Sequence, residues 1–172
     1  WGVTFSRVEE DYFGDKYECS KSGEMDSYAM FIERALLNLK RNGLLGYITP
    51  DTFLRKDGHE SLRRLLLENN RIIEMIETGP VFSGVRDTWC LVIRIQKSKP
   101  DSNAIVRHRQ LSRFIVSSEE RLETFGDQRW DLEAEVSQRT WVRRPSMIIG
   151  YLANEVDQAI IEKLERYPAL SA

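Results

Sequence analysis

The chain has 172 residues, a length that suits one domain or one domain plus an appendage, and its 41% hydrophobic and 30% charged residues are ordinary for a soluble globular protein. Its formal net charge of -2 excludes a surface covered throughout by nucleic-acid-binding charge, although a local basic footprint stays open. The absence of any run of about 18 apolar residues excludes a membrane span, and the opening residues lack the pattern of a signal peptide.

The first predicted element is an irregular segment followed by a helix. Residues 1–25 are polar and aromatic, with many charges, and predict a long loop. From Asp26 onward, apolar residues recur at the spacing of one helical face. Asp26 or Ser27 begins this helix, and Asn42-Gly43 ends it with a left-handed residue. The predicted face consists of Tyr28, Phe31, Ile32, Ala35, Leu36 and Leu39.

Strands and a second helix follow. The apolar run 44–49, closed by Pro50, is typical of a strand buried on both faces, as in parallel sheets. Further strands are predicted at 71–77 and 88–95. Between the first two lies a helix at about 58–69, with Leu62, Leu65 and Leu66 on its inner side.

This order of elements indicates an α/β sheet. The first two strands need a helical crossover, which makes them parallel, and the short connection to the third predicts an antiparallel hairpin at that edge. Three strands are few for a sheet covered on both sides. The sequence therefore predicts the second half of a larger sheet.

The pattern weakens beyond the third strand. Residues 103–110 alternate like an edge strand, a short helix is predicted from Ser117 to Phe125, and residues 130–141 fit either a helix or a strand. We assign residues 100–172 to a connecting region. A last helix, which must stop near Pro168, is marked by Val156, Ala159, Ile160 and Leu164.

The residues by themselves specify no reaction. His59 and His108 have no cysteine or second histidine at metal-ligand spacing, so no metal site is predicted. Cys19 and Cys90 predict free thiols in a reducing cytoplasm. The glycine-rich phosphate-binding motifs and the nucleophile motif G-x-S-x-G are absent from the sequence.

Two aromatic residues are more informative. Phe31 belongs to the apolar stripe of the first helix, where core packing is its ordinary role. Phe82 lies in a turn between two strands, bracketed by glycine and proline, where a ring is either a lid over the core or a stacking surface for a flat ligand. Both readings of each residue stay open at this point.

Three motifs follow one another in the first third of the chain. Ser27–Ala35 reads x-Y-x-x-F-x-E-x-A, Lys40 with Gly43 forms a lysine and glycine turn, and Pro50–Leu54 reads P-x-x-F-L after a predicted strand. In this order and spacing the chain resembles the adenine-specific DNA methyltransferases of the TaqI and Eco57I type, whose last motif is proline followed by x-x-[FW]-L. The resemblance continues through Thr78-Gly79 and Val81-Phe82 to the strand 91–98, and covers roughly residues 26–98.

The resemblance implies a fold and an activity. Residues 1–99 would be the C-terminal part of a Rossmann-like catalytic domain, and 100–172 an extension toward a target-recognition domain. The implied reaction transfers a methyl group from S-adenosylmethionine to the N6 amine of an adenine that is flipped out of double-stranded DNA. The F-x-G-x-G cofactor loop and the N-P-P motif of the family are absent from these 172 residues, so we expect the isolated chain to be inactive.

The resemblance also assigns residues. Phe82 matches the position that packs against the flipped adenine, and Phe31 matches the position that lines the pocket of the cofactor's adenine. Trp1 is either the last aromatic of an N-P-P-aromatic motif, facing the adenine from its other side, or an arbitrary start. The candidate DNA contacts are Arg86, Arg55 and Lys56, with ordinary surface charge as the alternative.

Two further readings stay open. The parent enzyme is either a methyltransferase alone or one fused to a restriction nuclease. The competing function is a non-catalytic nucleic-acid-binding or assembly module that keeps the sheet, with the basic clusters of residues 100–172 as its working part.

Overall fold

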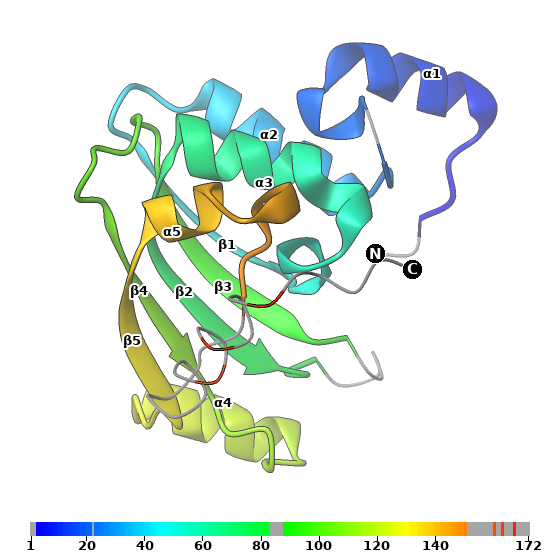
Figure 1. Cartoon of the computed structure of the whole chain (residues 1–172). Helices are drawn as coiled ribbons and strands as arrows, with labels where there is room; N and C mark the ends of the chain where they lie inside the picture. Colours follow the sequence, from blue (N-terminus) through cyan, green and yellow to red (C-terminus); the bar gives the residue numbers. More distant parts are fainter. Residues whose placement is uncertain are drawn as a thin grey trace.

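The computed structural model of the chain describes residues 3–21, 23–82 and 88–150, together with Ile160, Lys163 and Tyr167. Helices lie over one face of a five-stranded sheet, and one of them, α4, lies instead at the end of the sheet (Figure 1). The strands are β1 (Leu44–Pro50), β2 (Arg71–Gly79), β3 (Cys90–Gln96), β4 (Ile105–Gln110) and β5 (Leu132–Ser137). The α-helices are α1 (Arg7–Lys16), α2 (Ser27–Asn38), α3 (Glu60–Asn69), α4 (Ser118–Gly126) and α5 (Gln138–Val142). Short 3-10 turns are η1 (Glu18–Ser20), η2 (Thr52–Leu54), η3 (Asp57–His59) and η4 (Pro145–Met147).

The strand order is β1-β3-β2-β4-β5, and it confirms the predicted α/β class. β3 runs antiparallel to both β1 and β2, so these two strands are parallel to each other, as expected. The prediction that the hairpin strand β3 lies at the edge was wrong. The crossover through α3 leaves a gap one strand wide between β1 and β2, and β3 fills it.

β4 was predicted as an edge strand, and it is an interior one. It pairs parallel with β2 and antiparallel with β5. The ambiguous stretch 130–141 explains the difference, because it divides into a strand and a short helix, β5 and α5, and β5 becomes the edge. The predicted extension thus contributes two strands to the same sheet.

β1 is more exposed than its apolar sequence suggests. We expected burial on both faces, yet Leu44 is 58% and Ile48 is 40% exposed. β1 is an edge strand, and among the described residues its outer face has no covering helix (Figure 1). Leu45 and Tyr47, on the inner face, pack against the core cluster.

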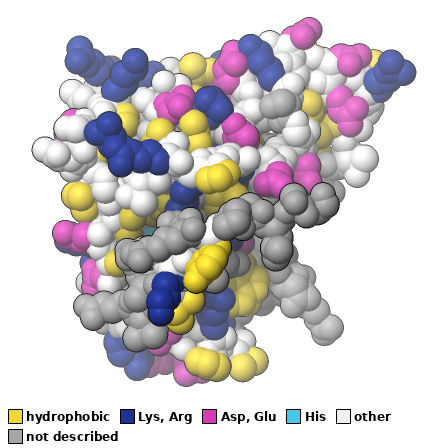
Figure 2. Space-filling model, in the orientation of Figure 1, with side chains coloured by type: hydrophobic (Ala, Val, Ile, Leu, Met, Phe, Trp, Pro, Cys, Tyr) yellow, Lys and Arg dark blue, Asp and Glu magenta, His cyan; other side chains and the backbone are white. Residues whose placement is uncertain are grey.

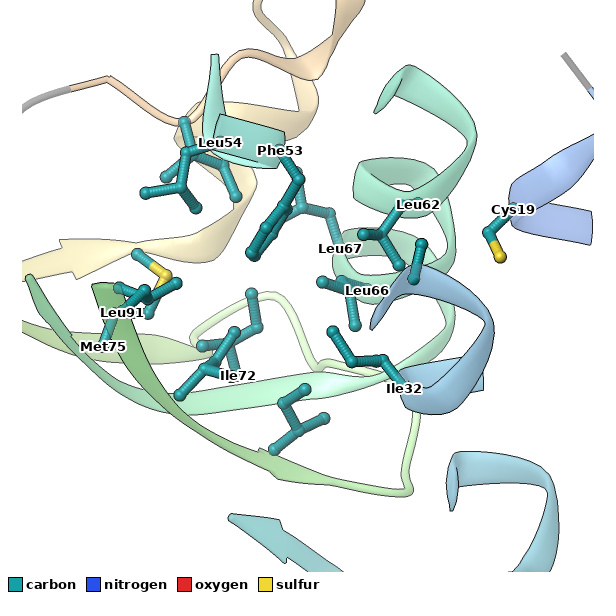
Figure 3. Close-up of a cluster of buried hydrophobic side chains, with 14 of the residues drawn as sticks. Cys19, Ile32, Phe53, Leu54, Leu62, Leu66, Leu67, Ile72, Met75 and Leu91 are labelled. Atoms are coloured by element: carbon teal, nitrogen blue, oxygen red, sulfur yellow. The ribbon is translucent and has the colours of Figure 1, made fainter. Parts of the chain in front are cut away.

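The core lies between the helices and the inner face of the sheet (Figure 3). Ile32 of α2 and Leu66 of α3 lie on the side of Ile72, and Met75 and Leu91 of the strands lie at the other side of the same cluster. Fully burying such a side chain stabilises the fold by about 1.5–3 kcal/mol. On α3 the buried leucines are Leu62, Leu66 and Leu67, whereas the predicted Leu65 is only partly buried.

The segment before α2 is helical rather than irregular. α1 begins with a capping box, in which Ser6 accepts from the backbone of Glu9 and Glu9 binds the backbone of Ser6. α1 buries no residue, so it has no apolar period to reveal it. The S-x-x-E spacing at Ser6 was the available signal.

The remaining sequence predictions have mixed outcomes. Ser117 caps α4 as expected, and Asn42 adopts the predicted left-handed conformation, with φ of 63°. The first predicted helix, α2, nevertheless ends at Asn38, before that turn. The predicted helix around Val156 to Leu164 lies largely outside the described residues. No helix in the described ranges is long and apolar enough to cross a membrane.

Candidate functional site

The parallel strands β1, β2 and β4 end at the same edge of the sheet. We call this the carboxyl edge. The loops that follow these strands begin at Asp51, Pro80 and Leu111. In open α/β sheets, ligands bind outside the carboxyl ends of the strands. The candidate site is therefore built from these three loops.

Arg63 fixes the loop after β1. Its side chain is fully buried, and its Nη1 donates to the backbone oxygens of Phe53 and Lys56, each at 2.6 Å. Its Nε donates to the oxygen of Ser146 at 3.0 Å. One guanidinium thus holds α3, the β1 loop and the segment after α5 together.

Arg121 of α4 does the same for the other two loops. Its Nη1 donates to the backbone oxygen of Thr78, at the end of β2, at 3.0 Å and to that of Ser112 at 3.1 Å, while Nη2 donates to Ile115. Gly79, with φ of 71°, makes room for this contact, because a Cβ there would lie 2.6 Å from the Arg121 Nη1. The ends of β2 and β4 therefore share one buried anchor.

A buried charge cluster lies beneath these loops. Nε2 of His108 donates to Glu77 at 2.8 Å, and both side chains are 1% exposed. Nη2 of Arg55 donates to the other oxygen of Glu77 at 2.8 Å, and Nη1 lies 3.3 Å from Asp51. Burial alone would raise the pKa of Glu77, but His108 and Arg55 lower it below its ordinary value. Burial raises the pKa of Asp51.

Two aromatic rings flank the end of β2. Phe82 follows it by three residues and is 41% exposed, so its ring is not enclosed in the core. Trp89, just before β3, has the guanidinium carbons of Arg113 and Arg121 at 5.7 and 5.8 Å from its ring centre. Trp89 belongs to the predicted strand 88–95 and is not among the predicted site residues, whereas in the structure it precedes β3. The signal was its position between a glycine-rich turn and an apolar run.

Phe31 lies elsewhere on the sheet, over β1. Its side chain is 63% exposed, so core packing does not account for it. It lines a cavity of about 460 Å³ with Ser27, Tyr28, Gly46, Tyr47 and Ile48. It also lines a second cavity, of about 250 Å³, with Phe5, Phe13, Tyr17, Ser27, Met30 and Arg34.

The remaining predicted site residues fall into two groups. Arg55 has only 18% of its side chain exposed and is held by Asp51 and Glu77, an arrangement that favours a structural role. Lys56 is 55% exposed and pairs with Glu24. Trp1 and Arg86 lie outside the described residues.

Within the described ranges, one group has the composition of a metal site. Ligand atoms of Glu24, Asp26 and His59 lie within 4.8 Å of one another. The ammonium of Lys56 already binds Glu24, and His59 contacts the Tyr28 hydroxyl at 3.3 Å. The chain's own groups therefore satisfy much of this cluster.

Glu33 explains another part of the motif that carries the resemblance. Its carboxylate is buried on α2 and accepts from the backbone nitrogens of Glu18 and Cys19, at 3.0 and 2.9 Å. It thus ties the segment after α1 to the helix that carries Phe31. Cys19 is a free, buried thiol whose pKa is raised to about 12, chiefly by burial.

Comparisons with known proteins agree with this architecture. Residues 3–82 match the family model described as Eco57I restriction-modification methylase. The type II restriction enzyme and methyltransferase RM.Eco57I of Escherichia coli is 29% identical over 136 residues, which are 78% of this chain and 13% of that protein. The type II methyltransferase M.VspI of Vibrio sp. (strain 343) is 26% identical over 168 residues, or 98% of this chain and 36% of that protein.

A solved structure shows the same fold. A nuclease-deletion mutant of the type ISP restriction-modification enzyme LlaGI, in complex with a DNA substrate mimic, covers 89% of this chain with a TM-score of 0.61. The identity is 14%, and the match spans 14% of that enzyme. The chain thus spans only a minor part of the proteins it matches. In sequence, the chain is similar to the Eco57I-type restriction-modification methyltransferases, and in fold it matches part of the LlaGI enzyme.

Proposed function

We propose that the chain is part of a DNA methyltransferase that modifies the N6 amine of adenine, with S-adenosylmethionine as the methyl donor. The single observation that carries the proposal is Phe82. Its partly exposed ring stands three residues after the end of an anchored strand at the carboxyl edge. The amine of adenine is inaccessible inside a duplex, so the base must be turned out and held.

Phe82 is suited to hold such a base. An aromatic face stacks on any nucleobase, at a gain of about 1–3 kcal/mol per base. The ring is presented by a rigid support, because Arg121 binds the backbone of Thr78 four residues earlier. Phe82 would orient the adenine and exclude water from one of its faces.

The cavity beside Phe31 fits the adenine portion of the methyl donor. It offers a flat, exposed ring, the hydroxyl of Ser27 and a glycine, Gly46, with open space where a side chain would stand. When bound, S-adenosylmethionine supplies an electrophilic methyl group. Phe31 would position that molecule over β1 by stacking on its adenine portion.

The groups that activate the adenine amine are proposed to come from the parent chain. The N-P-P element is absent from these 172 residues. We propose that the first half of the sheet pairs along β1, whose outer apolar residues Leu44 and Ile48 are exposed. The partner of the intact protein would be double-stranded DNA, and the similar LlaGI enzyme was solved in complex with a DNA substrate mimic.

The competing function, a non-catalytic binding module that uses the basic clusters, finds less support. Arg109 binds Glu74 and Glu133, each at 2.8 Å, and Arg94 lies 3.7 Å from Glu74. These ion pairs cross β3, β2, β4 and β5 on the outer face of the sheet. Arg109, at the centre of one basic cluster, is therefore already paired with carboxylates of the chain itself.

The test is to incubate the intact parent protein with duplex DNA and labelled S-adenosylmethionine, and to analyse the digested nucleosides by mass spectrometry. Labelled N6-methyladenine is the expected product. Labelled methylcytosine, or no transfer by a folded protein, would overturn the proposal. Cleavage of the same DNA would identify a fused nuclease.

A further inference from the structure

The loop from Leu111 to Ser117, between β4 and α4, carries two unusually exposed apolar side chains. Phe114 and Val116 are each 91% exposed. Single exposed apolar residues are ordinary on protein surfaces, and they need no explanation by themselves. Two that are almost fully exposed within three residues on one anchored loop are more informative.

Their exposure does not come from a loop without support. Arg121, only 2% exposed, donates to the backbone oxygens of Ser112 and Ile115, on both sides of Phe114. The backbone nitrogen of Leu111 donates to the backbone oxygen of Glu77 at 3.0 Å and so continues the pairing of β4 with β2. The fold therefore holds the backbone of the loop in place and leaves the side chains of Phe114 and Val116 exposed to solvent.

The loop lies at the same edge as Phe82. Phe114 follows the end of β4 by four residues, Phe82 follows the end of β2 by three, and the two strands are parallel neighbours. Arg121 binds the end of β2 and the Phe114 loop at once. Hydrophobic side chains reach the surface at the end of the molecule where α4 lies (Figures 1 and 2).

The size and charge of this feature favour a narrow apolar partner. A stable protein interface buries about 800 Å² on each side, whereas a phenylalanine contributes about 150–250 Å². The adjacent first turn of α4 is acidic, with Glu119 and Glu120, so a nucleic acid that meets Phe114 would keep its phosphates away from this turn and contact the loop through its bases. The stacked base pairs of a duplex offer an apolar partner of the required thickness.

We propose that Phe114 is a wedge that enters the base stack of duplex DNA beside the adenine turned out toward Phe82, with Val116 supporting it. This inference rests on the proposed function. Inserting an apolar side chain between base steps separates the bases and offsets part of the cost of unstacking. Phe114 would thus promote extrusion of the base, while Phe82 holds the base afterwards.

The experiment uses the intact parent enzyme and its Phe114→Ala variant with two duplexes. One duplex is fully paired, and the other has an abasic site opposite the target adenine, which lowers the cost of extrusion. Phe114→Ala should reduce methyl transfer about 10-fold or more on the paired duplex and leave transfer on the abasic duplex near the wild-type rate. The fluorescence of 2-aminopurine at the target position should fall in parallel on the paired duplex.

Two further variants make the result specific. Phe114→Leu keeps an apolar wedge and should retain most of the activity. Val8→Ala shortens a side chain that is 78% exposed on α1, at the other end of the molecule (Figure 1). It should leave the rate of methyl transfer unchanged on both duplexes. The salt dependence of DNA binding should be the same for wild type and Phe114→Ala, because no phosphate contact is lost.

The outcomes separate the wedge from the proposed function. If the wild-type enzyme methylates adenine and Phe114→Ala is equally active on the paired duplex, only the wedge is wrong. An equal loss on both duplexes, with a lower unfolding midpoint, would reveal a contact with another part of the protein and would also overturn it. If the wild type transfers no methyl group to adenine, both proposals fail.

Discussion

At the scale of single residues, this chain presents its two key aromatic rings rather than burying them. Phe31 is 63% and Phe82 is 41% exposed, although Phe31 belongs to the apolar stripe of its helix. An exposed ring makes a clean target for mutation, because its truncation opens no cavity in the core. The effects on activity and on folding can therefore be measured separately.

The first prediction concerns Phe82. In the intact enzyme, Phe82→Ala should reduce methylation of duplex DNA about 10- to 100-fold, because stacking of about 1–3 kcal/mol is lost. The affinity for S-adenosylmethionine, measured by calorimetry, should stay close to that of the wild type. Tyr12→Ala, which removes an aromatic that is 53% exposed on α1, is the matched control. Unchanged turnover in Phe82→Ala would remove this residue from the site.

The second prediction concerns Phe31. Phe31→Ala should raise the dissociation constant for S-adenosylmethionine about 10-fold, which corresponds to a lost stacking contact of about 1.4 kcal/mol. The unfolding midpoint should change little, since the ring is mostly exposed. Leu37→Ala, at a position that is 58% exposed on the same helix, should leave the affinity unchanged. Normal affinity in Phe31→Ala would contradict the assigned role.

The third prediction concerns Glu77 and pH. Its pKa is lowered in the folded chain, so the carboxylate contributes stability above its ordinary value near 4.5 and loses it as the pH falls further. Urea unfolding should show wild-type stability decreasing below about pH 5. Glu77→Gln should be less stable at pH 7 by about 1.5–3 kcal/mol, with a flatter acid dependence.

The control for this measurement is Glu10→Gln, because Glu10 is an exposed carboxylate on α1. Its unfolding free energy should follow that of the wild type across the pH range. An identical acid dependence in Glu77→Gln and in the wild type would show that the buried cluster does not carry the effect.

At the scale of elements, two buried arginines organise the carboxyl edge. Arg63 of α3 holds the loop after β1, and Arg121 of α4 holds the loops after β2 and β4. Backbone oxygens in irregular loops need partners when they are buried, and a guanidinium has five donors in a fixed geometry. These helices therefore shape the site without contributing a residue to it.

The fourth prediction follows from this geometry. Arg63→Lys keeps the charge but cannot span three backbone oxygens, so the chain should lose about 2–4 kcal/mol of unfolding free energy. Arg64→Lys changes the neighbouring, half-exposed arginine, whose pairs with Glu60 and Glu68 are surface ion pairs. It should cost no more than about 0.5 kcal/mol. Equal effects in urea unfolding would contradict the anchoring role.

At the scale of the whole molecule, the outer face of the sheet has two characters. Across β2, β4 and β5 it carries ion pairs that suit contact with water, such as that between Glu74 and Arg109. On β1 it exposes Leu44 and Ile48. This contrast supports the proposal that further strands and helices of the parent chain cover β1.

The fifth prediction tests that proposal with one substitution that should improve the isolated chain and harm the intact parent. Ile48→Lys should make the 172-residue chain more soluble, since it places a charge on an exposed edge strand. In the intact parent, the same change should lower the unfolding midpoint and abolish methylation. Ile105→Lys is the control, because Ile105 is similarly exposed, at 43%, on β4. Ile48→Lys with no effect in the parent would mean that β1 stays uncovered.

Most of the fold could be predicted from local patterns. The apolar period of 3.6 residues located α2 and α3, and the apolar runs located the three strands β1 to β3, because secondary structure follows from which faces must be buried. The crossover rule correctly made β1 and β2 parallel. α1 was missed because it buries nothing, so only its Ser6 capping box marked it.

By itself, the sequence indicated α2 to α4, the strands β1 to β4 and the resemblance to a methyltransferase family, since short-range periodicity and ordered motifs are written along the chain. Only the tertiary structure decided the strand order, which put β3 and β4 inside the sheet. It also decided that Arg55 and His108 turn inward to Glu77 and that Phe31 stays outside. Such choices depend on contacts between residues far apart in the chain, whose burial and charge balance no local pattern records.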